Sequence, residues 1–131
     1  MSGFAFTLNE EVLSFTASGD LSLCQNRVVD MITNADLVIG LAPAAGGYGV
    51  LLNAPKDGQP ASVVVAGITM VRVGAAVQAG NDLTSAASGW AVADVSGTSE
   101  RVIGRALTGA ASGSLASVHL RQFYHPNSVG A

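Results

Sequence analysis

The stretch ASVVVAGITMVRV, residues 61–73, has the clearest strand character in the chain. Its β-branched side chains favour extended backbone and pack well on a pleated surface. Gly67 interrupts the run, and a glycine inside a strand marks a bulge or a sharp bend. The pattern therefore predicts a strand, a break at Gly67, and a second strand.

Short β-prone runs separated by glycine-containing turns recur about every dozen residues on both sides of this stretch. Residues 24–33 fit either a strand or one face of a helix, and the pattern leaves the choice open. About eight to ten short strands predict an all-β fold, a small β-barrel or sandwich with extended N- and C-terminal arms. The other expected strands are 4–8, 12–16, 37–41, 49–53, a strand beginning at Trp90, 101–107 and 114–121.

The length of 131 residues suits one domain with short arms. We expect an N-terminal arm over residues 1–20, a β-barrel domain over 21–121 and a C-terminal tail over 122–131. Both ends carry phenylalanines that need a surface against which to bury.

The surface is expected to be poor in charge. Hydrophobic residues make up 49% of the chain and charged residues only 11%, where an ordinary domain has about 25%. Small residues replace the charged ones, so another protein can cover this surface with little loss of hydration or side-chain entropy. The composition favours a protein that works inside an assembly.

Several classes of function are disfavoured. The net charge is −3, from six basic and nine acidic residues that form no basic stripe, so direct nucleic-acid binding is not expected. The N-terminus lacks the basic segment of a secretory signal. The longest charge-free stretch, 37–55, contains Pro43 and several glycines, which disfavours a membrane span. The lone Cys24 cannot form an intramolecular disulfide and is compatible with assembly in a reducing cytoplasm.

Two segments together resemble a known family. They are GYGVLLNAPKDGQPASVVVAGITMVRVGAAVQAGNDLTSAASGWAV, residues 47–92, and RVIGRALTGAASGSLASVHL, residues 101–120. Their order of strands, turn glycines and small-residue loops resembles the capsid cement or head decoration proteins of tailed bacteriophages. The span covers a little over half of the chain, and the first forty-odd residues match less well.

The resemblance implies a small β-barrel that forms a homotrimer and binds the major capsid protein. Its implied place is the outer capsid surface of the virion, after synthesis in the host bacterial cytoplasm. Arms are expected to reach over neighbouring capsid subunits.

Glycines within the same span are expected to mark turns with positive φ or close backbone approaches. Such positions build a scaffold and do not by themselves form a reaction centre. These structural turn glycines are Gly67, Gly74, Gly80, Gly89, Gly104 and Gly113.

Candidate contacts with the capsid or between subunits come from aromatic side chains near the ends and from two arginines on one predicted strand. The alternative is that the aromatics close the ends of the barrel and that the arginines form a solvated face. The candidates are Phe4, Phe6, Phe15, Arg101, Arg105, Phe123 and Tyr124.

Catalysis is not predicted. A nucleophile needs a neighbouring base, and the only histidines, His119 and His125, are expected on the surface. Cys24 has Arg27 nearby in sequence, but a small buried hydrophobic residue is the commoner role for a lone cysteine.

Ligand and phosphate sites are not predicted either. One cysteine and two histidines match no zinc spacing, and Asp57 and Asp82 are isolated turn carboxylates. The adjacent Glu10 and Glu11 would point to opposite faces of a strand. The only lysine, Lys56, follows no phosphate-binding loop. We therefore expect no catalytic residue, metal, cofactor or small-molecule substrate.

The predicted function is that of a structural virion protein that binds a phage capsid and stabilises it. One alternative is a head-fibre base, or a display module that binds glycans or receptors. Another is a small hydrolase with a pocket around His119, which the sequence supports poorly.

Overall fold

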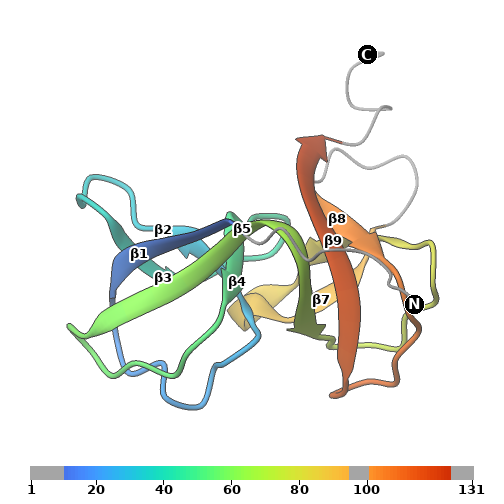
Figure 1. Cartoon of the computed structure of the whole chain (residues 1–131), viewed down its shortest axis with the longest axis horizontal. Helices are drawn as coiled ribbons and strands as arrows, with labels where there is room; N and C mark the ends of the chain where they lie inside the picture. The colour runs from blue at the N-terminus through green and yellow to red at the C-terminus, as the bar shows by residue number, and fades with distance from the viewer. Residues whose placement is uncertain (1–10, 95–100, 125–131) are drawn as a thin grey trace, which may run out of the picture.

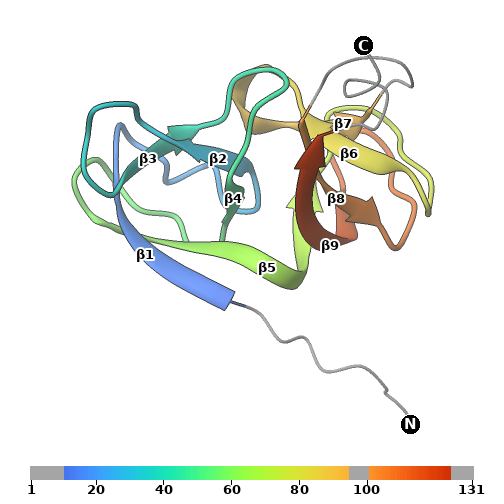
Figure 2. The same cartoon turned by 90° about the horizontal axis from the view of Figure 1, so that it is seen from above.

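A single long strand, β5 (Pro60–Arg72), connects the two halves of the molecule. The computed structural model describes residues 11–94 and 101–124. Residues 61–72 of the quoted segment all lie in this one strand, which does not split into two, but Gly67 has φ 100° and lies where the pairing partners of β5 change. Figure 2 shows β5 turning sharply along its length.

The described chain contains nine strands and one short 3-10 helix. None of its helices is long and apolar enough to cross a membrane. Besides β5, the elements in chain order are β1 (Glu11–Ala17), β2 (Val28–Met31), β3 (Val38–Leu41), β4 (Gly49–Leu51), β6 (Asp82–Ser85), η1 (Ala87–Gly89), β7 (Ala91–Ala93), β8 (Arg101–Ala106) and β9 (Leu115–Tyr124).

Five strands close into a barrel, which we call the first barrel. Their order is β1-β3-β2-β4-β5, and β1 also pairs with β5, which completes the circle. The β1–β3 pair is parallel and the other pairs are antiparallel. Its interior holds Phe15, Ile39, Leu51 and Val63, with the ring of Phe15 edge-on to Tyr48 at 6.0 Å between centroids.

The other half of β5 begins a second sheet in the order β5-β9-β8-β6-β7. This sheet curls so far that its edge strand β7 returns to the end of β5, where Val73 and Ala91 form a parallel bridge. The N–H of Gly74 donates to the carbonyl of Ala91 at 2.8 Å. Figure 1 shows the first barrel and the second sheet side by side along the longest axis.

The larger of the two hydrophobic cores crosses the junction between the halves. It joins Val28, Val50 and Val64 from the first barrel to Leu83 and Ile103 from the second sheet. All five side chains are fully buried. The two halves therefore share apolar contacts as well as a strand and form one packed unit.

The all-β, barrel-type fold class is confirmed, and the ambiguous segment 24–33 contains a turn at residues 25–26 followed by the strand β2. The expected alternation in residues 101–107 fails at one point. A register shift between Val102 and Gly104 lets Ile103 turn into the core, away from the exposed Arg105.

The boundaries of the arms differ from those that the sequence suggested. Residues 11–17, expected within an arm, form the strand that closes the first barrel. At the other end β9 extends to Tyr124, so the strand passes the expected boundary at residue 121. The expected strand 4–8 lies outside the described residues.

We predict that the two halves unfold together, because they share β5 and a core. Leu51→Ala in the first barrel and Leu83→Ala in the second sheet each remove a fully buried side chain. Each should lower the free energy of unfolding by about 2–5 kcal/mol. Urea titrations followed by circular dichroism and by Trp90 fluorescence should give coincident single transitions.

The matched control is Leu23→Ala, since Leu23 is 91% exposed. It should change stability by less than about 0.5 kcal/mol. Two separate transitions in either core variant would contradict the shared-core description.

Candidate functional site

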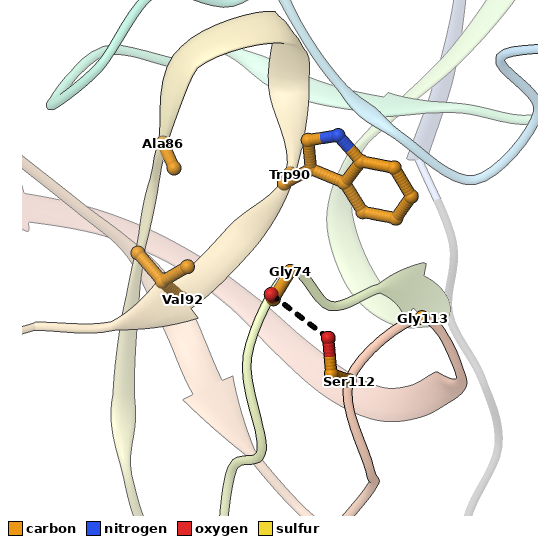
Figure 3. A pocket seen from close by; sticks show the side chains of 6 residues that line it. All are labelled: Gly74, Ala86, Trp90, Val92, Ser112 and Gly113. Carbon is orange, nitrogen blue, oxygen red and sulfur yellow. Dashed lines mark hydrogen bonds between the residues drawn. The ribbon is translucent and has the colours of Figure 1, made fainter.

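A shallow apolar pocket of about 200 Å³ opens where the end of β5 meets β7 and the loop before β9. Figure 3 shows the indole of Trp90 and the side chain of Val92 beside this opening. The Ser112 hydroxyl donates to the carbonyl of Gly74 at 3.0 Å and so ties the loop to the strand. The lining residues are Gly74, Ala86, Trp90, Val92, Ser112 and Gly113.

The short helix η1 sets the position of Trp90. Ser88 and Gly89 have positive φ values of 62° and 78°, which turn the chain back toward the sheet. The N–H of Gly89 donates to the carbonyl of Ala42 at 3.0 Å, and Ala86 donates to the carbonyl of Trp90 at 2.7 Å. A Cβ added at Gly74 would lie 2.8 Å from the Cβ of Trp90, so a larger residue there would displace the indole.

Arg27 covers the Trp90 ring from the first barrel. Its guanidinium carbon lies 4.1 Å from the ring centroid, a cation–π arrangement. Its Nη1 donates to the carbonyl of Ser88 at 3.4 Å, and its buried Nε has no hydrogen-bond partner among the described residues. This contact joins the two halves, and the pocket that it borders suits one apolar side chain.

A second hollow of about 230 Å³ lies on the outer face of β6, β8 and β9. Arg105 Nε and Asp82 Oδ1 form an ion pair at 3.0 Å, with side chains 63% and 25% exposed. Register pairing places Arg105 opposite His119, and Arg121 follows on the same face of β9. We call this the basic patch, made of Asp82, Arg105, Leu107, His119 and Arg121.

The candidate contact residues are placed very differently from one another. Phe15 is 6% exposed inside the first barrel, so it is a core residue and the prediction of a surface contact is wrong. Arg105 is exposed in the basic patch. The backbones of Arg101, Phe123 and Tyr124 pair at the ends of β8 and β9, and Phe4 and Phe6 lie outside the described residues.

The turn glycines fall into two groups. Gly67, Gly80, Gly89 and Gly113 have positive φ. Gly74 and Gly104 are close-approach positions, where an added Cβ would meet the Cβ of Trp90 and the carbonyl oxygen of His119 respectively.

The remaining polar candidates are dispersed. Cys24 is buried in the first barrel, and Asp57 accepts a hydrogen bond from the N–H of Gly19 at 2.8 Å. His125 and Glu10 lie outside the described residues. Within residues 11–94 and 101–124, no three His, Cys, Asp or Glu side chains are grouped to hold a metal ion.

The sequence did not reveal the stacking of Arg27 on Trp90. Sixty-three positions separate them in the chain, and no local pattern connects them. The basic patch was partly visible, because His119 and Arg121 share the polar face of an alternating strand. Their position next to Arg105 depends on the pairing of β8 with β9.

The fold is similar to that in the crystal structure of the head fiber gp8.5 N base of bacteriophage phi29. The TM-score is 0.68 and the sequence identity is 20%, over 86% of this chain and 94% of that one. The chain matches no protein-family model, and no curated protein is significantly similar to it. At this level of identity the likeness establishes a shared fold.

Arg27→Ala should release the Trp90 ring. We expect a shift of the tryptophan emission to longer wavelength and a loss of about 1 kcal/mol of stability, because the cation–π contact joins two halves of the fold. Fluorescence and thermal unfolding measure both effects. Lys56→Ala, an exposed cation away from the ring, is the control. An unchanged emission spectrum in Arg27→Ala would mean that the strands alone hold the indole.

Proposed function

We propose that this protein is a non-enzymatic structural protein of a tailed-phage virion that binds the outer capsid surface and stabilises the shell. The observation that carries the proposal is the fold shared with a phage head-fiber base over 86% of the chain. The resemblance of residues 47–120 to capsid cement proteins points to the same kind of particle. No cofactor or small-molecule substrate is part of the proposed role.

The proposed partners are the major capsid protein and two further copies of the chain. The sparse charge supports this, because a surface with 11% charged residues loses little hydration when a neighbour covers it. The apolar pocket beside Trp90 is a suitable place for one side chain of a partner. Synthesis would occur in the host bacterial cytoplasm, where the single Cys24 stays reduced.

The proposed mechanism is multivalent burial. A trimer makes three sets of modest contacts with capsid subunits, and once one set is bound the others act at a high effective concentration. A ligand that binds only the intact shell shifts the equilibrium away from separated subunits. The shell then withstands a greater internal pressure from packaged DNA before it ruptures.

A second candidate is the base of a head fibre, and the similarity to the phi29 head-fiber base favours it specifically. Such a base would bind the shell and display a receptor- or glycan-binding part without strengthening the shell. Binding to shells is therefore common to both candidates, and stabilisation separates them.

Shells that contain the protein should rupture at a higher temperature, and after stronger osmotic shock, than shells without it. DNA release measured by dye fluorescence during heating gives the rupture temperature for both. If shells with and without the protein rupture at the same temperature although the protein is bound, the head-fibre role replaces the cement role. No binding to any shell would reject both.

Phe4 and Phe6, which the sequence places in an N-terminal arm, test whether that arm contacts the shell. Full burial of one phenylalanine contributes about 1.5–3 kcal/mol, so changing both to alanine should weaken shell binding at least tenfold in a sedimentation assay. Thermal stability of the free protein should stay the same. The matched comparison is Phe15→Ala, which removes a core side chain and should lower stability instead. If the double variant binds shells with wild-type affinity, the N-terminal arm does not contribute to shell binding.

A further inference from the structure

Charge is divided unequally along the chain. Residues 1–66 contain six acidic and two basic side chains, a formal charge of −4, whereas residues 67–131 contain three acidic and four basic ones, a charge of +1. The described parts of these halves correspond to the first barrel and the second sheet, which lie at opposite ends of the long axis (Figures 1 and 2). The molecule therefore has an acidic end and a basic end.

The basic patch contains two of the four arginines in residues 67–131. Asp82 neutralises Arg105 at 3.0 Å, whereas Arg121 has no ion pair with the described residues. Leu107, 42% exposed, adds an apolar wall to the hollow. Such a surface fits a segment that carries a carboxylate beside aliphatic side chains.

The connection between β2 and β3 carries a carboxylate beside exposed aliphatic side chains. We call residues 31–37 the hairpin tip. Met31, Ile32 and Leu37 are 41%, 40% and 61% exposed, and the exposed Asp36 lies next to Leu37. The sequence has no basic residue between Arg27 and Lys56 to offset this carboxylate.

The backbone of the hairpin tip is strained at an exposed residue. Leu37 has φ 57°, a left-handed conformation that a leucine seldom adopts. The N–H of Ile32 donates to the carbonyl of Val38 at 2.9 Å and holds the base of the tip. A strained, exposed leucine held on a short hairpin is a feature that commonly accompanies binding.

We propose that the hairpin tip of one copy binds the basic patch of the next copy, with Asp36 paired to Arg121 and Leu37 against Leu107. The hairpin tip belongs to the first barrel and the basic patch to the second sheet, and these two halves lie at opposite ends of the molecule (Figures 1 and 2), so the contact joins different surfaces. Contacts of this kind close into rings when the rotation between copies allows it. The inference rests on the homotrimer in the proposed function and names the surfaces that form it.

A second copy fits the basic patch better than an unrelated acidic protein, because the chain itself carries the complementary segment. Association of two first barrels, each with five acidic and two basic side chains over residues 11–66 and so a formal charge of −3, would bring like charges together and is disfavoured. The head-to-tail arrangement instead places each acidic end against a basic one.

A charge swap on the full chain tests the contact. Arg121→Glu and Asp36→Arg should each weaken a single contact between copies by about fivefold. Because a ring of three copies has three such contacts, the association constant of the trimer should fall by about a hundredfold. The double variant should recover association to within about threefold of the wild type. Sedimentation equilibrium at low and high salt measures this, and salt should weaken the wild-type assembly.

Lys56→Glu is the matched control, because it reverses an exposed charge that belongs to neither surface; it should not change association. All the altered residues are exposed, and circular dichroism checks that each variant folds. Failure of the double variant to recover, or a wild type that stays monomeric, would overturn the inference.

Binding of the same variants to shells is measured in parallel, so that the two proposals can fail separately. If Arg121→Glu leaves the trimer intact and abolishes shell binding, the patch binds the capsid and not a second copy. If the charge swaps change trimer formation as expected but neither the wild type nor any variant binds shells, the contact between copies stands and the proposed function fails.

Discussion

Thirteen consecutive residues of β5 serve two sheets, and most of the architecture depends on that sharing. The first half of the strand closes a barrel with β1 and β4, and the second half supports β9. A positive φ at Gly67 lets the strand change direction where its partners change. Because the valines of β5 contribute to both cores, neither half can be removed without exposing buried apolar surface on the other.

The same junction positions the surface features. Arg27 reaches from the first barrel over Trp90 at the edge of the second sheet, and this stack borders the apolar pocket. The basic patch forms where three strands of the second sheet place their polar faces side by side. Both features lie on the outside of the molecule, where the proposed contacts with other proteins would form.

A two-part, sparsely charged module of this kind suits the proposed position on the surface of a virion. Its few charges are divided between opposite ends, so they can direct how copies meet without requiring strong individual ion pairs. Apolar side chains at the hairpin tip and in the pocket can then contribute contact area. Charge would set the orientation, and burial would supply most of the affinity.

Local sequence patterns were enough to predict the all-β class, most of the strands and the sharp bend at Gly67, since alternation and turn glycines act over a few residues. They misplaced Phe15 and the strand of residues 11–17, because nothing local distinguishes an arm from a strand that closes a barrel through pairing with residues 60–66. Three further features were decided by the tertiary structure: the Arg27–Trp90 stack, the position of Arg105 beside His119 and Arg121 in the basic patch, and the bulge that buries Ile103. Each depends on which strands pair and in what register, and contacts between residues distant in the chain decide that pairing.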